Sequence, residues 1–191
     1  MPNVRAWLRD YLKGDDEDAA AADKAALETA WKIHAALVDW TGRVDTKASF
    51  SFTLQSAALG VIVALSDEGR MFGLLEGPWQ NIAYRVACLA LIFGAASSMW
   101  VVIPRLRMRH VKKEWPDNFI YFGHLKFWKP EDLEAKIRQA DMLSVLSKQL
   151  VGMSRIAWAK HILVKIAMSL ASVGGLSLLL CAALIQAGLT P

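Results

Sequence analysis

A run of uncharged residues in the first third of the chain limits what it can fold into more than any other feature. Residues 48–66 contain no Asp, Glu, Lys or Arg, and a helix needs about 20 apolar residues to cross the roughly 30 Å core of a bilayer. The polar side chains of this run lie in its first half. The pattern predicts a membrane span whose first turns face other helices, because buried hydroxyl and amide groups need partners there. A buried helix of a soluble protein is the alternative.

Two later stretches have the same character, and they favour the membrane interpretation. Residues 86–103 and 166–187 are also free of charged residues, and the flanking Arg85 can extend its side chain to the headgroups. We predict an all-α integral membrane protein of one domain, with helices that extend from the membrane into a cytoplasmic helical bundle. The three predicted spans are 48–66, 85–104 and 161–187.

The remaining segments are predicted to be helical and aqueous. Residues 1–14 form a short amphipathic segment, which either lies in the membrane interface or packs on the protein, and Gly14 can end it. Residues 15–47 form a cytoplasmic helix that runs into the first span. Residues 105–160 form a basic and aromatic insert. Apolar residues at helical spacing from Leu133 to Ala157 predict one helix that continues without a break into the third span.

The charges of the loops predict the orientation. The loop between the first two spans carries Asp67, Glu68, Glu76 and a single Arg70, whereas residues 105–165 carry thirteen Lys or Arg and six Asp or Glu. Basic loops stay in the cytoplasm. The N-terminus and the insert are therefore predicted to be cytoplasmic, and the C-terminus of this multi-pass protein is predicted to lie outside.

Small residues on the later spans predict close helix packing. A helix can approach another most closely where its side chains are small, and three spans alone leave little room for a pore, so we expect a homo-oligomer. The candidate packing residues are Gly94, Ser97, Ser98, Gly174 and Gly175.

No catalytic or metal-binding pattern stands out, so we expect neither an enzyme nor a cofactor. The four histidines lack metal-ligand spacing, and no phosphate loop, CxxC pair or nucleophile elbow occurs. The insert does combine basic residues near Arg109 with aromatic residues near Tyr121. Arginine binds phosphate and aromatic faces stack on bases, so the segment could bind a small nucleotide. On sequence alone the favoured interpretation is a topological signal that attracts anionic lipid, followed by an aromatic belt at the membrane edge.

Several short patches together resemble the Pycsar effector transmembrane (PycTM-type) family. They are the DxKAS pattern of Asp45, Lys47, Ala48 and Ser49 at the start of FSFTLQSAALGVIVAL, the sequence NFIYFGHL at 118–125, and Gln149 and Lys160 on the helix that enters the last span. The resemblance covers about 27–171.

The resemblance implies an effector in the bacterial inner membrane that takes part in anti-phage defence. A partner cyclase makes cCMP or cUMP on infection, the effector impairs the membrane, and the infected cell dies, which is abortive infection. If this cyclic pyrimidine nucleotide binds directly, the candidate residues are Lys47, Arg109, Tyr121, His124 and Lys160. The expected partners are the lipid bilayer and the nucleotide, and no nucleic acid. The alternative function is a membrane scaffold or adaptor that holds a cytosolic partner and forms no pore.

Overall fold

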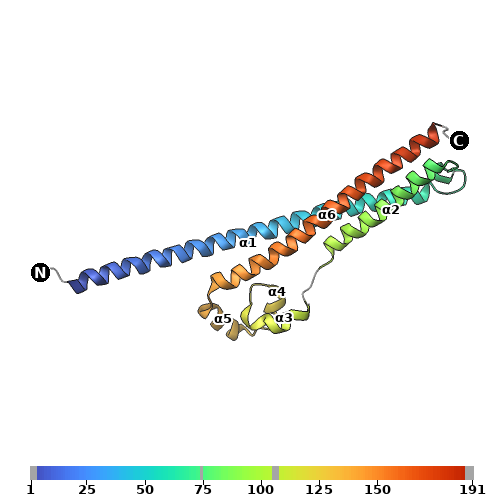
Figure 1. Cartoon of the computed structure of the whole chain (residues 1–191). Coiled ribbons are helices and arrows are strands. Elements are labelled where there is room, and N and C mark those ends of the chain that lie inside the picture. The colour runs from blue at the N-terminus through green and yellow to red at the C-terminus, as the bar shows by residue number, and fades with distance from the viewer. Residues whose placement is uncertain (1–3, 74, 105–107, 188–191) are drawn as a thin grey trace. The chain divides into compact units, whose positions relative to one another are not determined.

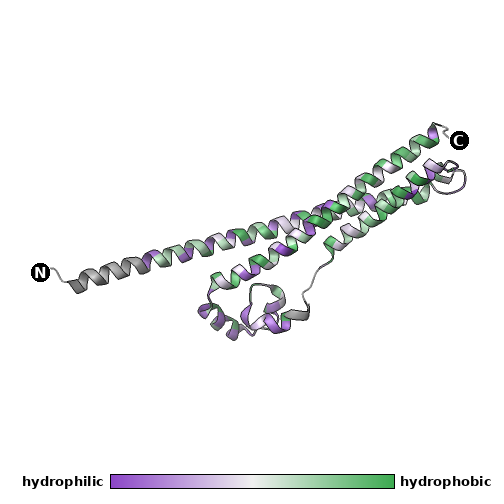
Figure 2. Ribbon diagram, viewed as in Figure 1, coloured by the Kyte–Doolittle hydropathy of each residue, from purple (hydrophilic) through white to green (hydrophobic). Residues whose placement is uncertain are grey.

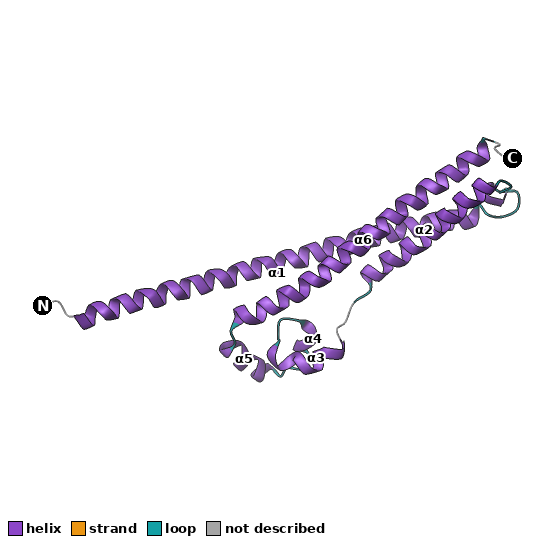
Figure 3. Cartoon of the chain, viewed as in Figure 1, coloured by secondary structure: helices purple, strands orange, loops and turns teal. Residues whose placement is uncertain are grey.

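The computed structural model describes residues 4–73, 75–104 and 108–187, and the side chains of 17–73, 75–104 and 111–187. These residues form helices and loops, with no strand in the described part of the chain (Figure 3). Three helices are long and apolar enough to cross a membrane. They are α1 (Val4–Ala64), α2 (Pro78–Val102) and α6 (Met142–Gln186). The predicted all-α fold with three helices suited to span a membrane is confirmed.

Helix α1 is one unbroken element, so Gly14 lies within it and does not end a first short helix. A glycine inside a helix costs only about 1 kcal/mol relative to alanine, and the four consecutive alanines at 19–22 favour the helix that follows. Beyond Ala64, the Arg70 guanidinium donates a hydrogen bond to the Ala64 carbonyl, which the helix itself leaves unpaired. Gly69 has a φ of 76°, so this turn needs glycine.

Between α2 and α6 the described residues form the short helices α3 (Met108–Glu114), α4 (Phe122–Leu125) and α5 (Pro130–Gln139) and a 3₁₀ turn at Trp115–Asp117. Another 3₁₀ turn, Met71–Gly73, follows α1. The predicted unbroken helix into the last span is wrong at one point, because α5 ends at Gln139 and α6 begins at Met142. Asp141 causes the break: its Oδ1 accepts hydrogen bonds from the backbone N–H groups of Leu143 and Ser144, at 3.1 and 3.2 Å. An Asp that caps a new helix in this way stabilises a helix start rather than a helix interior.

The described residues divide into two compact units. The second unit comprises Trp40–Pro104 and Ile156–Pro191, in which the C-terminal part of α1 lies beside α2 and α6 (Figure 1). One buried cluster joins Ile62 of α1 to Leu91 of α2 and Cys181 of α6. Another joins Val44 and Ala48 of α1 to residues of α2 and α6. Residues of α2 and of the C-terminal part of α6 are mostly hydrophobic (Figure 2), and many of their large apolar side chains are exposed.

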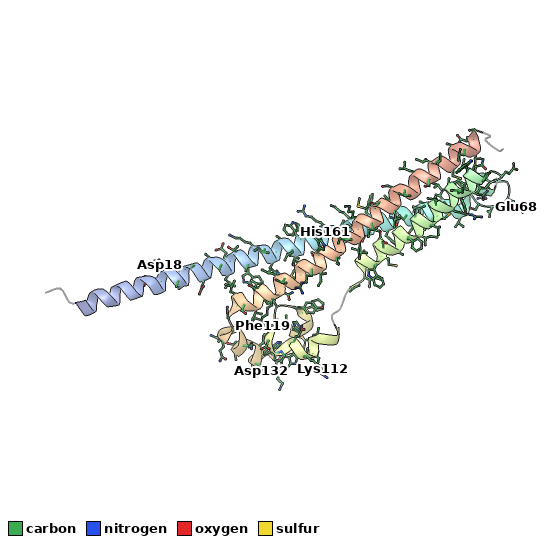
Figure 4. The ribbon with its side chains drawn as sticks, viewed as in Figure 1. Asp18, Glu68, Lys112, Phe119, Asp132 and His161 are labelled. Atoms are coloured by element: carbon green, nitrogen blue, oxygen red, sulfur yellow. The ribbon has the colours of Figure 1, made fainter. Side chains whose placement is uncertain are left out.

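The first unit comprises Met1–Asp39 and Arg105–Arg155. Its buried residues include Val111 of α3, Phe119 of the following loop, and Val145 and Leu146 of α6. Phe119, with Lys112 and Asp132, is labelled in Figure 4. The first unit therefore buries apolar side chains from α3, the following loop and α6.

Candidate functional site

An ion pair joins α1 to α6 in the second unit. The Lys160 Nζ lies 2.6 and 2.8 Å from the two carboxylate oxygens of Asp45. The Lys160 side chain is 11% exposed and that of Asp45 is 37% exposed. Helix α6 contains no acidic residue, so the counterion for Lys160 has to come from another helix. Since an unpaired buried ammonium is costly, the pair holds α1 and α6 in register beside their uncharged stretches.

A buried glutamine links the same two helices further along. The Gln55 Nε2 donates hydrogen bonds to the Ser51 hydroxyl at 3.0 Å and to the Ala167 carbonyl of α6 at 2.9 Å. Gln55 and Ser51 are 1% and 4% exposed. An amide at membrane depth needs partners of this kind, because hydrocarbon offers none. The predicted inward orientation of polar groups in the first span is thus confirmed for these two residues.

Helix α2 completes this arrangement through Gly94 and Ser98. A Cβ at Gly94 would lie 2.9–3.1 Å from the side-chain amide atoms of Gln55, so only glycine leaves room for the amide. Ser98, one helical turn further on, is fully buried, and its hydroxyl and the Gln55 Oε1 have no hydrogen-bond partner among the described residues. We call Ser51, Gln55, Gly94 and Ser98 the polar layer. It places two unpaired oxygen atoms inside the spanning part of the chain.

Two other hydroxyl groups of the first span point outward. Ser49 and Thr53 are exposed, and each donates a hydrogen bond to the carbonyl four residues earlier, at 3.0 and 3.1 Å. A hydroxyl that bonds to its own helix can face lipid at little cost. This local bonding removes the need for a neighbouring helix at these positions.

The candidate packing residues divide into two groups. Gly94, Ser98 and Gly174 pack within the chain, and a Cβ at Gly174 would lie 2.7 Å from the Leu91 Cγ. Ser97 instead donates a hydrogen bond to the Phe93 carbonyl at 2.8 Å, and a Cβ at Gly175 would have no atom within 4 Å. The first group therefore serves the fold of one chain.

The aromatic residues of the insert pack on one another. The rings of Trp115 and Trp128 meet edge to face with centroids 4.9 Å apart, and the Trp128 Nε1 donates to the carbonyls of Trp115 and Asn118 at 3.2 and 3.3 Å. The Lys136 Nζ lies 3.6 Å from the Asp117 Oδ1 on the same unit. The cluster is held together by its own contacts, an arrangement that neither sequence interpretation included.

Two of the candidate nucleotide-binding residues are neighbours in this cluster. The ring centroids of Tyr121 and His124 are 5.4 Å apart. His124 is 5% exposed, and its Nε2 lies 3.9 Å from the Glu114 Oε2. The Tyr121 ring occupies the space where a Cβ at Gly123 would lie, so glycine is needed there. Tyr121 is the more accessible of the two rings.

The remaining candidates are placed as follows. Lys47 is exposed on α1, and Lys160 is already bonded to Asp45. Arg109 belongs to α3, but its side chain lies outside the described residues. Lys47 and Lys160 belong to the second unit, and Tyr121 and His124 to the first. Among the described residues, no group of three His, Cys, Asp or Glu could hold a metal ion.

Sequence reasoning missed the partnership of Asp45 with Lys160. A usable signal existed, since Lys160 stands near an uncharged stretch on a helix that has no acid. A lysine in that position needs a carboxylate from another helix. Asp45 likewise lies near the start of an uncharged stretch, the one that begins at residue 48.

Comparison with known proteins assigns the chain to a family. The family profile described as the Pycsar effector protein domain (PycTM) matches residues 29–188. No curated protein sequence and no solved structure matches the chain. The matched region contains the ion pair, the polar layer and the insert, and it covers most of the sequence. The chain therefore belongs to the Pycsar effector family of anti-phage defence.

Proposed function

We propose that this protein is a non-enzymatic membrane effector that a cyclic pyrimidine mononucleotide, cCMP or cUMP, activates during phage infection. The activated protein impairs the integrity of the bacterial inner membrane, and the cell dies by abortive infection. The observation that carries the proposal is the family match over 29–188, because it includes all three apolar helical segments together with the insert.

The resting state would be held by the polar links between the spans. A ligand activates by binding a second arrangement more tightly than the first. To change the ratio of activated to resting molecules from 1:99 to 99:1, the ligand must bind the activated state more tightly than the resting state by about 5.5 kcal/mol. Hydrogen bonds to charged groups contribute about 1.5–3 kcal/mol each, so two or three contacts to one phosphate are sufficient. The ion pair and the Gln55 link are the contacts that an activated arrangement would exchange.

For the nucleotide we propose the residues of the insert, Arg109, Tyr121 and His124, with a phosphate held by arginine and a base against the tyrosine ring. Lys47 and Lys160 are the second set. In this alternative set, within the second unit, Lys160 would bind the ligand phosphate only by exchanging the Asp45 carboxylate for it. Such an exchange would couple binding directly to the contact between α1 and α6.

Membrane damage by this chain requires assembly of several copies. Only 22%, 39% and 11% of the spanning windows of α1, α2 and α6 are buried within one chain, so most of their surface is available to lipid or to other copies. Ser97 and Gly175 remain candidates for such contacts. We further propose a cytoplasmic N-terminus and insert and an external C-terminus, which a reporter fused after Pro191 and one inserted near Pro116 would test.

The direct experiment is co-expression with a cyclase that makes cCMP or cUMP, with loss of membrane potential measured by a voltage-sensitive dye. Depolarisation should require both the active cyclase and the effector. A cyclase without catalytic activity is the control. Continued polarisation with nucleotide present would reject the proposal and leave the scaffold function in its place.

Direct sensing is tested by calorimetry on the purified protein. Tyr121→Ala and Arg109→Ala should weaken binding of the nucleotide, whereas Arg138→Ala, which removes an exposed arginine of α5, should not. The melting temperature of each variant shows whether its fold is retained. Absence of binding heat for both nucleotides at millimolar concentration would mean that activation does not proceed by direct binding.

A further inference from the structure

An open groove of about 530 Å³ lies where α1 meets α6 in the second unit. None of its lining residues belongs to the aromatic cluster of the insert, to the ion pair or to the polar layer. His161, labelled in Figure 4, is one of its lining residues. The groove is lined by Lys47 of α1 and by residues of α6, namely His161, Val164, Lys165, Met168, Ser169 and Ser172.

The end of the groove at Lys47 and Lys165 is positively charged, and no described acidic side chain forms an ion pair with either lysine. Both lysines are exposed. The nearest acid in sequence, Asp45, is bonded to Lys160. The other acids of this unit all lie in the loop beyond the far end of α1, at 67, 68 and 76. Two positive charges at the groove therefore favour an anionic ligand.

His161 adds an imidazole beside these lysines. Its Nδ1 lies 2.8 Å from the Ala157 carbonyl, and since a carbonyl only accepts hydrogen bonds, Nδ1 is the donor. The Nε2 atom of the exposed ring is left for a ligand group or water. The groove thus combines two ammonium groups and one imidazole.

The other end of the groove carries no charged residue, and its one exposed hydroxyl without a hydrogen-bond partner among the described residues is that of Ser169. Val164 is buried and Met168 is 50% exposed. Ser172 donates its hydroxyl to the Met168 carbonyl at 3.1 Å, so it presents little polarity to a ligand. Lys165 to Ser172 covers about 10 Å along the helix axis, within a stretch that is uncharged from 166 to 187. A small soluble anion would use the charged end alone, whereas an amphiphile uses both ends.

We propose that this groove binds an anionic phospholipid of the leaflet in which α1 and α6 enter the membrane. Lys47 and Lys165 contact the headgroup phosphate, His161 contacts the headgroup, and an acyl chain lies along Met168 and Ser172. The bound lipid joins the two helices that the Asp45–Lys160 pair also joins. Lys47 is also in the second set of residues proposed for the nucleotide, so the test below includes cCMP as a competitor.

The test uses the full-length protein in neutral detergent, titrated with dioleoylphosphatidylglycerol and with dioleoylphosphatidylcholine. Native mass spectrometry counts bound lipid. A lysine near an anionic headgroup contributes about 1 kcal/mol, or roughly fivefold in affinity. The anionic lipid should therefore bind about 25-fold more tightly than the zwitterionic lipid.

The variants decide whether these lysines are responsible. In Lys47→Gln/Lys165→Gln the preference for the anionic lipid should disappear, and in Lys47→Arg/Lys165→Arg it should remain. Lys112→Gln/Lys113→Gln removes the same charge from exposed positions on α3 and should leave the preference unchanged. Retention of the full preference in the first variant would overturn the proposal.

Soluble anions separate a lipid site from a site for free phosphate. Glycerol 3-phosphate and cCMP carry the phosphate without acyl chains, so neither should displace the anionic lipid from the wild-type protein at equal concentration. Displacement by either compound would show that the groove binds free phosphate, and the lipid proposal would fail. Failure here leaves nucleotide-dependent depolarisation of cells untouched, so the two proposals are tested separately.

Discussion

The pair formed by Asp45 and Lys160 supports a prediction in which the two partners behave differently. Breaking a fully buried ion pair by removing one partner costs about 3–5 kcal/mol. Here the Asp45 side chain is 37% exposed and the Lys160 side chain 11% exposed, so solvent screens the carboxylate more than the ammonium. The cost of a substitution therefore depends on which charge is left behind.

Asp45→Asn leaves the buried ammonium, and we expect the free energy of unfolding to fall by about 2–3 kcal/mol. Lys160→Met leaves the better-hydrated carboxylate, and the loss should be about 1–2 kcal/mol. The double variant leaves neither charge and should lose only about 1 kcal/mol. The coupling free energy is then roughly 2 kcal/mol or more, which is large for a single pair.

The assay is unfolding in mixed micelles, followed by circular dichroism as the fraction of sodium dodecyl sulfate is raised. The exposed pair of Glu134 and Arg138, with a 2.7 Å separation and side chains 67% and 75% exposed, is the matched control. Its coupling should be about 0.3–0.5 kcal/mol. Additive losses within about 0.5 kcal/mol for the Asp45 and Lys160 variants, or a greater loss for Lys160→Met than for Asp45→Asn, would refute the reasoning.

Two further predictions follow from local contacts. Gly94→Leu should destabilise the protein by more than 2 kcal/mol, because the leucine side chain would displace the Gln55 amide. Gly175→Leu places the same side chain in open space and should change the melting temperature of the purified monomer little. Equal effects of the two substitutions would contradict the packing described. Asp141→Ala removes two capping hydrogen bonds and should cost about 1 kcal/mol, with faster amide hydrogen exchange at Leu143 and Ser144; unchanged exchange there would refute the capping role.

The spanning segments could be predicted because the physical constraint is strong. Charged residues are rare at hydrocarbon depth, so uncharged runs of sufficient length stand out in one sequence without further information. The same reasoning predicted that polar groups such as Gln55 face other helices. It did not distinguish Gln55 from Ser49 and Thr53, whose hydroxyls bond to carbonyls of their own helix.

The contacts between distant residues could not be predicted in this way. Asp45 and Lys160 are 115 positions apart, and hydrophobic periodicity does not say which helices become neighbours. Asp141 was overlooked because a regular apolar spacing continues across it, although one side-chain oxygen that accepts two backbone N–H groups is enough to begin a new helix there. The aromatic residues of the insert suggested stacking platforms, but several of them are used in packing against each other.

Gln55 offers a way to separate the structure of the resting state from the function proposed for it. Gln55→Leu removes two hydrogen bonds, and hydrogen bonds between spanning helices contribute only about 0.6 kcal/mol each on average. The same substitution removes the Oε1 atom, which is buried without a partner among the described residues. Because burying such an atom costs about 1–3 kcal/mol, its removal offsets the loss of the two hydrogen bonds. The free energy of unfolding should therefore change by between a loss of about 0.2 kcal/mol and a gain of about 2 kcal/mol.

Activity should respond differently if the polar layer takes part in membrane damage. In the activated arrangement, the amide of Gln55 and the hydroxyl of Ser98 would be the polar groups available to water and ions at membrane depth. We therefore expect Gln55→Leu to retain or exceed the wild-type melting temperature and to lose most of the cyclase-dependent depolarisation, while Gln55→Asn, which keeps an amide, retains part of it. Val63→Leu, at an exposed apolar position of the same helix, is the control and should leave depolarisation unchanged. Full depolarisation in Gln55→Leu would show that the polar layer serves only to hold α1 against α6, and the damage would then have to arise at the outward faces of the spans.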